Sequence, residues 1–350
     1  MLIYLPGILT CINILFSTFS ESYSAQMIKL EDIKKPVSRE MKEFDIRFKS
    51  EVSGDIPLLN LVTRFVLRKK GKQMRPLFVF LTSKLAGEIT EASYTAATLV
   101  ELMHTATLVH DDVVDESHER RGVFSINALW KSKVAVLFGD YLLAKGLILA
   151  VEKKNYELLE IVSHASKEMS EGELLQIQKS RSLNIDIDTY YDVIRMKTAS
   201  LIASCTACGA QAAGADSATI ASVHQMGIQI GMAFQIKDDL FDYQEHGVIG
   251  KPTGNDIKDK KFTLPLIYAL QQAEVGKRKA IIKKIKNGKR SQHVVNEVVQ
   301  FVKDMDGIAF AKSKMEEYKT SAMEILQSFP ESQARNSLRD LVEYTVSRKK

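Results

Sequence analysis

Apolar residues recur every three or four positions along nearly the whole chain from Met27 onward. That spacing is the period of an α-helix with one apolar face, and it is clearest in six segments: 58–67, 76–87, 96–110, 135–151, 157–177 and 220–243. Several segments are apolar nearly all round, which indicates helices at the centre of a large bundle. No stretch shows the bounded alternation of apolar and polar residues that predicts a sheet. The pattern therefore predicts an all-α fold.

Polar breaks interrupt the helical pattern without separating two domains. They fall at 52–57, 119–125, 180–188, 245–256 and 328–332. No Ser/Gly-rich linker and no internal repeat accompanies them. Residues 27–350 are therefore predicted to form one helical domain.

Residues 1–26 form a nearly charge-free apolar extension. The small residues at its end would suit a signal peptidase, but no Lys or Arg precedes the apolar run, and Pro6-Gly7 and Asn13 interrupt it. A secretory signal or membrane anchor and a plain upstream extension both remain open, and we favour the extension. If the segment is retained, it is marginal as a membrane span, which needs about 20 apolar residues.

Charge and cysteine content narrow the class of protein. The net charge of +5 is small and evenly spread, so we expect no nucleic-acid partner. Three cysteines cannot make a disulfide framework, which favours a reducing compartment and a cytoplasmic location. Cys205 and Cys208 form a C-x-x-C without further ligands nearby, so we interpret them as packing residues.

Two acidic clusters carry the first sign of chemistry. The stretch HTATLVHDDVVD and the stretch QIKDDLFDY share the spacing D-D-x-x-D, and the clusters are Asp111, Asp112 and Asp115 and then Asp238, Asp239 and Asp242. Carboxylates four residues apart share a helix face and repel one another. Two such clusters facing each other need cations between them. Magnesium fits best, because few carboxylates, several waters and substrate phosphate oxygens complete its octahedron.

Basic residues near these clusters indicate anionic substrates. Arg and Lys are the usual ligands of diphosphates. One purely basic set and one set beside the metal-binding clusters imply two anionic groups bound side by side. The candidates are Lys72, Arg75, Arg120, Arg121, Lys197, Lys251 and Lys261.

Together these motifs resemble the trans-prenyltransferases, the isoprenyl diphosphate synthases. The resemblance spans roughly residues 30–350 and rests on GKQMRP, HTATLVHDDVVDESHERRG, MKTASL and GMAFQIKDDLFDY followed by GKPTGNDIKDKKFTLP. It implies an all-α homodimer, a single large bundle of the isoprenoid synthase type with a central apolar cavity. It also implies magnesium, about three ions per active site, and condensation of isopentenyl diphosphate onto an allylic diphosphate.

The resemblance also implies roles for residues at matching positions. Both aspartate clusters are expected to hold the magnesium ions that bridge to the allylic diphosphate, with further contacts from Arg120, Lys197, Lys251 and Lys261. The isopentenyl diphosphate site is expected at Lys72, Arg75, His104 and Arg121. Thr198 and Gln235 are expected near the developing carbocation. The expected catalytic set is Asp111, Asp112, Asp115, Lys197, Thr198, Gln235 and Asp238.

Product length is predicted from two small residues. In the family, bulky aromatic residues just before the first aspartates act as a floor, whereas this chain has Ala106 and Thr107 there. We therefore expect a polyprenyl product of about six to ten isoprene units, with octaprenyl favoured. Deeper stopping residues are expected at Phe138 or near 160–165. A long product also implies a peripheral association with membranes for its release.

Three other functions were compared with this prediction. A terpene cyclase has a different second metal motif and no use for Lys72, Arg75 and Arg121. A farnesyl or geranylgeranyl synthase is opposed mainly by Ala106 and Thr107. A non-catalytic subunit of a heteromeric synthase commonly loses aspartates, and both clusters are intact in this chain.

Overall fold

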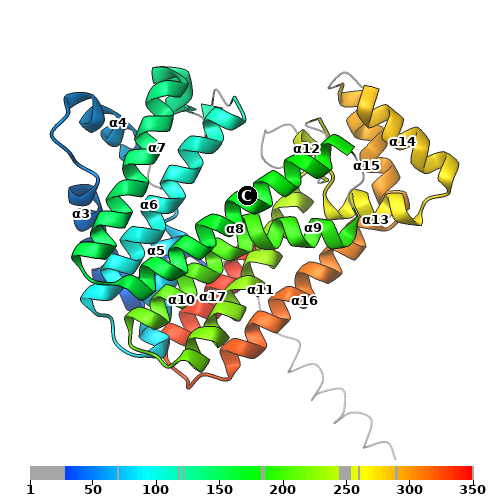
Figure 1. Cartoon of the computed structure of the whole chain (residues 1–350). Coiled ribbons are helices and arrows are strands. Elements are labelled where there is room, and N and C mark those ends of the chain that lie inside the picture. The colour runs from blue at the N-terminus through cyan, green and yellow to red at the C-terminus, as the bar shows by residue number, and fades with distance from the viewer. Residues whose placement is uncertain are drawn as a thin grey trace, which may run out of the picture.

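The computed structural model describes residues 28–68, 71–116, 119–120, 123–182, 186–243, 254–258, 261–287 and 291–348. Its elements in chain order are α2 (Leu30–Lys34), η1 (Lys35–Val37), α3 (Ser38–Glu51), α4 (Pro57–Arg68), α5 (Met74–Ala86), α6 (Glu91–Val114), β1 (Glu119–Arg120), β2 (Val123–Phe124), α7 (Ile126–Glu152), α8 (Tyr156–Ser182), α9 (Ile187–Ile194), η2 (Arg195–Ala199), α10 (Ser200–Ala212), α11 (Ser217–Phe241), α12 (Asn255–Lys258), α13 (Leu264–Gln272), α14 (Val275–Asn287), α15 (Gln292–Asp304), α16 (Gly307–Gln327) and α17 (Gln333–Ser347). Figure 1 shows their arrangement, with α3, α4, α6 and α7 on one side and α13 to α15 on the other.

The prediction of an all-α fold is confirmed, with one small addition. Strands β1 and β2 pair antiparallel, with Glu119 opposite Phe124 and Arg120 opposite Val123. This hairpin lies in the break predicted at 119–125 and joins α6 to α7. Each strand has two residues, too few to produce a period-two pattern in the sequence.

Helix α10 is the central element of the bundle. It packs against α5, α6, α8 and α11, and every residue of α10 except Gln211 is buried. Small side chains permit this close packing: a methyl group added to Gly209 would lie 2.4 Å from the backbone oxygen of Val79. Cys205 and Cys208 are buried in α10, and burial raises the pKa of the Cys205 thiol to about 12. The interpretation of these cysteines as packing residues is confirmed.

Helix α11 connects two hydrophobic clusters. Its first half, with Val223, Met226 and Ile230, packs in the cluster built from α2 to α8 and α10. Its second half, with Ile236 and Leu240, packs in the cluster built from α9, α13, α15 and α16. Helices α11 and α16 lie side by side (Figure 1). The second aspartate cluster thus lies at the end of α11, and the two hydrophobic clusters together fix the position of this helix.

Candidate active site

The two aspartate clusters occupy equivalent places in their helices. Asp111 and Asp112 lie in the last turn of α6, and Asp115 is its C-cap. Likewise Asp238 and Asp239 lie in the last turn of α11, and Asp242 is its C-cap. The C-terminal end of a helix carries the negative pole of the helix dipole, so carboxylates are unfavourable there. The carboxylates at each of these two helix ends therefore carry negative charge that a bound cation would stabilise.

Asp239 is the most enclosed carboxylate of the second cluster, with 6% of its surface exposed. Its Oδ2 accepts a hydrogen bond of 2.7 Å from the hydroxyl of Tyr190 on α9. Its Oδ1 accepts one of 2.8 Å from the amide of Gln235, one turn earlier on α11. Burial raises the pKa of the Asp239 carboxyl to about 7, although the two hydrogen bonds act in the opposite direction.

The other two aspartates of the second cluster have partners far away in the sequence. The guanidinium of Arg348, at the end of the chain, donates to Oδ1 of Asp238. The same guanidinium carbon lies 4.1 Å from the centre of the Phe234 ring. Oδ2 of Asp242 accepts from the backbone N–H of Asp256, which holds α12 against the end of α11. The cluster is therefore organised by protein groups from three other parts of the chain.

Lys197 and Thr198 lie on a π-helical segment, η2, between α9 and α10. Such segments are rare and occur often at functional sites. Thr198 donates a hydrogen bond of 2.9 Å to Oε1 of Gln235, so the structure brings together the two residues predicted to lie near the carbocation. Since Gln235 also bonds Asp239, one continuous network joins η2, α11 and α9.

Glycines on both sides hold the π-helical segment in place. A methyl group added to Gly172 on α8 would lie 2.8 Å from Cβ of Met196 and 2.9 Å from the backbone nitrogen of Lys197. One added to Gly231 on α11 would lie 2.4 Å from Cα of Ala199. Both distances are shorter than real Cβ contacts, so only glycine allows this approach.

The side chain of Lys197 is fixed by α8. Its ammonium forms an ion pair with Glu173 and lies 3.5 Å from Oε1 of Gln176. Neither Glu173 nor Gln176 belongs to a sequence motif of the site. Their place on the helix facing η2 could be recognised only from the packing of α8 against the π-helical segment.

The residues predicted to bind isopentenyl diphosphate lie at the loop-to-helix junction before α5 and on α6. Lys72 lies in the loop before α5, and its ammonium is 5.1 Å from the centre of the Tyr344 ring. Arg75 lies in the first turn of α5 and is close enough to Cys205 on α10 to act on its pKa. His104 is buried on α6. Lys72 thus precedes α5, whereas Arg75 lies within it.

Some predicted residues cannot be placed in the site. Arg121 and Lys251 lie outside the described residues, as do residues 1–26, and only the backbone of Arg120 is described, in β1. Lys261 is exposed, and its backbone N–H donates 2.8 Å to the oxygen of Asp256, close to the second cluster.

The two residues predicted to set product length lie on α6. Ala106 is completely buried, whereas Thr107 is half-buried and its hydroxyl donates 2.9 Å to the backbone oxygen of His104. Phe138 on α7 is buried and lines a cavity of about 10 Å³ with Thr105, next to Ala106 in sequence. Of the region near 160–165, Val162 and Ala165 on α8 are buried.

The aspartates of the two clusters are the predicted ligands of a metal ion. No three Asp, Glu, His or Cys side chains within the described ranges are close enough together to hold an ion by themselves. A hard cation held by single carboxylates from two helices, by water and by substrate phosphate fits this arrangement. Cys205 and Cys208 do not fit a metal site, because both thiols are buried in the core.

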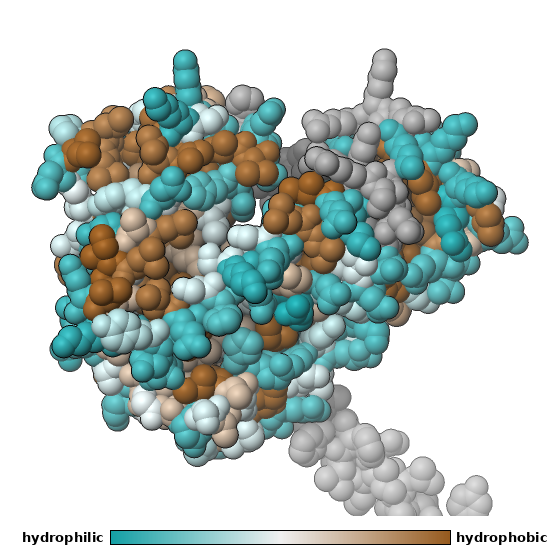
Figure 2. Space-filling model, in the orientation of Figure 1, coloured by the Kyte–Doolittle hydropathy of each residue, from teal (hydrophilic) through white to brown (hydrophobic). Residues whose placement is uncertain are grey.

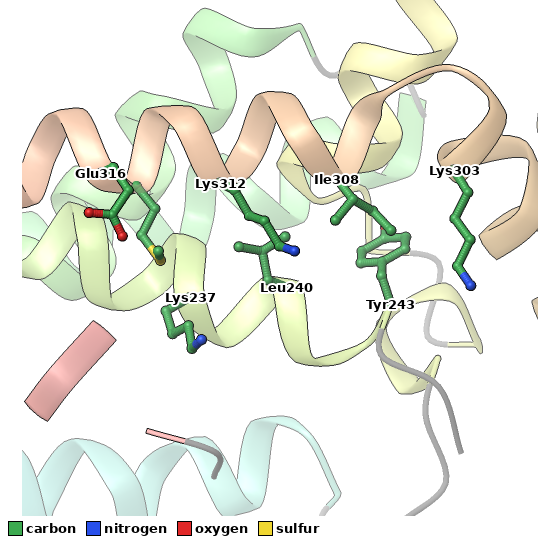
Figure 3. A pocket seen from close by; sticks show the side chains of 8 residues that line it. Lys237, Leu240, Tyr243, Lys303, Ile308, Lys312 and Glu316 are labelled. Carbon is green, nitrogen blue, oxygen red and sulfur yellow. The ribbon is translucent and has the colours of Figure 1, made fainter. Parts of the chain in front are cut away.

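A larger cavity, of about 490 Å³, lies between α11 and α16 (Figure 3). In this view Ile308 stands over the ring of Tyr243, and Lys312 reaches from α16 toward Leu240. Its lining residues are Lys237, Leu240, Tyr243, Lys303, Ile308, Lys312, Met315 and Glu316. Among the described residues, none of those predicted for the site lines this cavity.

Comparison with known proteins shows the family. The model for the polyprenyl synthetase family matches residues 56–302. A curated relative, the all-trans-nonaprenyl-diphosphate synthase (geranyl-diphosphate specific) of Rhodobacter capsulatus, is 34% identical over 320 residues, covering 91% of this chain and 98% of the relative.

Solved structures show the same fold. Polyprenyl synthase from Caulobacter crescentus CB15, complexed with calcium and isoprenyl diphosphate, has a TM-score of 0.85 and 29% identity, covering 93% of this chain and 99% of that chain. Geranylgeranyl pyrophosphate synthase from Bacteroides thetaiotaomicron has a TM-score of 0.77 and 37% identity, covering 91% of this chain and 98% of that chain.

The chain belongs to the polyprenyl synthetase family and has the helical isoprenoid synthase fold. The resemblance drawn from the aspartate motifs is confirmed, and so is the assignment as an enzyme that transfers prenyl groups to form polyprenyl diphosphates.

Proposed function

We propose that the chain adds several isopentenyl units to a farnesyl or geranyl diphosphate primer and releases a polyprenyl diphosphate of about six to ten isoprene units, octaprenyl first among them. The observation that carries this proposal is Ala106, completely buried on the aspartate-bearing helix α6. It lies five residues before Asp111, about 7.5 Å along the helix axis at 1.5 Å per residue. A methyl group at that depth takes up less space than an aromatic ring would. The nonaprenyl specificity named for the Rhodobacter relative agrees with a long product.

The carboxylates that would hold magnesium are Asp111, Asp112 and Asp115 from α6 and Asp238 and Asp242 from α11, with about three ions expected per site. Bound magnesium would neutralise charge on the departing diphosphate as the allylic C–O bond ionises. Lys197 would add a cation to the same leaving group from η2, positioned by Glu173. Arg120, Lys251 and Lys261 are proposed as further contacts to this diphosphate.

The second substrate is positioned by a separate set of residues. Lys72, Arg75, His104 and Arg121 are proposed to hold the isopentenyl diphosphate, so that its double bond reaches the allylic cation. Thr198 and Gln235 present a hydroxyl and an amide, already bonded to each other, beside that cation. The buried core around α10 excludes water, which would otherwise capture the cation. The proton lost at the end passes to the released diphosphate.

A homodimer is proposed from an exposed apolar face on α7. Among the described residues, α7 alone is long and apolar enough to cross a membrane, yet only 39% of its most apolar stretch is buried. Leu137, Leu147 and Ile148 are 60%, 53% and 51% exposed and recur at helical spacing. Figure 2 shows apolar side chains gathered where α7 lies in Figure 1. A second copy of the chain, covering this face, would bury it. The dimer is proposed to be cytoplasmic and to contact membranes only peripherally, when it releases the product.

Product analysis tests the proposed length. Purified protein with magnesium, isopentenyl diphosphate and farnesyl diphosphate should give products of about 30 to 50 carbons by mass spectrometry. Ala106→Tyr should shorten the product while the first condensation continues, and Ala106→Val should change it less. A product of 20 carbons from the unmodified protein would establish the short-chain alternative. No diphosphate release at all would favour the non-catalytic subunit.

A further inference from the structure

Both oxygens of the Asp239 carboxylate are already used by the protein. Tyr190 donates to Oδ2 at 2.7 Å and Gln235 to Oδ1 at 2.8 Å. Asp239 is 6% exposed and Tyr190 4% exposed, so neither group has room for a hydration shell. Magnesium keeps several of its waters and demands near-ideal octahedral geometry. Binding it at Asp239 would need space for those waters beside a carboxylate that Tyr190 and Gln235 already enclose.

The same two hydrogen bonds determine where Gln235 can point. Its amide nitrogen donates to Asp239, which leaves Oε1 free to accept from Thr198 at 2.9 Å. Without Asp239 the amide could rotate, and the Thr198 hydroxyl would lose its fixed partner. Buried polar networks of this kind are stable only when each member is satisfied.

We propose that Asp239 and Tyr190 are positioning residues, which orient Gln235 and through it the Thr198 hydroxyl, and that Asp239 is not a metal ligand. The predicted metal set thus loses Asp239, and the site gains Tyr190, which lies outside the sequence motifs. The proposal rests on the proposed function only where it concerns turnover. The hydrogen bond from Tyr190 to Asp239 can be tested in metal-free protein, without any measurement of turnover.

The adjacent tyrosine provides a matched control. Tyr191 is also on α9, but its hydroxyl is buried without a hydrogen-bond partner among the described residues, and its ring packs against Tyr318. Tyr191→Phe removes the same atom as Tyr190→Phe without touching the network. Tyr191→Phe should therefore leave the denaturant midpoint of unfolding unchanged or raise it.

The first measurement uses metal-free protein in EDTA. Tyr190→Phe should lower the denaturant midpoint relative to both the unmodified protein and Tyr191→Phe, because a buried carboxylate loses its donor. Equal midpoints for the two variants would overturn the positioning role of Tyr190. This result does not depend on whether the protein is active.

The second measurement determines two quantities for each variant: kcat and the magnesium concentration that gives the half-maximal rate. Tyr190→Phe and Asp239→Asn should lower kcat about tenfold or more, with that concentration unchanged. Asp238→Asn should raise the magnesium concentration for half-maximal rate about tenfold or more, because Asp238 stays in the proposed metal set. An equal rise for Asp239→Asn would make Asp239 a metal ligand and refute the proposal. Should the unmodified protein show no turnover, the proposed function fails, and the EDTA measurement still decides the role of Tyr190.

Discussion

Gly172 is the residue at which the packing of α8 and the position of Lys197 can be perturbed together. Gly172→Ala would place a methyl group 2.8 Å from Cβ of Met196 and 2.9 Å from the backbone nitrogen of Lys197. Neither atom is the free end of a flexible side chain. The added group must therefore push α8 and η2 apart.

The expected loss of stability follows from two opposing effects. Overpacking a core position costs about 1–3 kcal/mol, and replacing glycine by alanine within a helix returns up to about 1 kcal/mol. The net effect is a lower free energy of unfolding, by about 1 kcal/mol. The effect on turnover should be larger, since a misplacement of about 1 Å near the reacting centre can cost about 100-fold.

The assay pairs chemical unfolding with release of diphosphate in the presence of magnesium and both substrates. Gly276→Ala is the control, because nothing lies within 4 Å of a methyl group added there in the first turn of α14. It should match the unmodified protein in both measurements. If Gly172→Ala kept full turnover, the close approach of α8 would not be what positions Lys197.

Three more predictions concern contacts around the site and the dimer. Glu173→Gln should leave the fold intact but lower kcat, measured by diphosphate release, because Lys197 loses the carboxylate that positions it. Arg348→Ala should lower the magnesium concentration for half-maximal rate, by about tenfold at most, since the guanidinium no longer competes for Asp238. A higher magnesium requirement in this variant would contradict the competition. Ile148→Glu should shift the protein to monomers in light scattering, because it places a charge on the exposed face of α7. An unchanged mass would show that this face is not the dimer contact.

The sequence predicted those features of the site that depend on local spacing. Asp111 and Asp115, four residues apart on one helix, and the equivalent pair on α11 follow directly from helical periodicity. The apolar pattern predicted for this helix begins at residue 76, and α5 itself begins two residues earlier, at Met74, so that Lys72 precedes the helix and Arg75 lies in its first turn. The family resemblance predicted that Thr198 and Gln235 both lie near the carbocation, but not the hydrogen bond between them, which joins residues 37 positions apart.

The features that the sequence did not predict depend on packing between distant segments. Arg348 lies 110 residues from Asp238, and a basic residue at a chain end carries no periodic signal. Tyr190 reads as an ordinary apolar position of α9, because its hydroxyl matters only when α9 lies against the end of α11. The sequence also carries no signal for the π-helical turn at η2, because its residues continue the pattern of an ordinary helix.

The protein itself compensates the charge of the second aspartate cluster. In the second cluster, Asp239 and Asp242 are buried and accept hydrogen bonds from Tyr190, Gln235 and the backbone of Asp256. In the first cluster Asp112 is also buried, Asp111 is half-buried and Asp115 is exposed at the end of α6. Burial without partners would cost several kcal/mol per charge, so the second cluster can be preorganised only because those donors exist. The end of α11 is therefore held in place by hydrogen-bond donors of the protein itself.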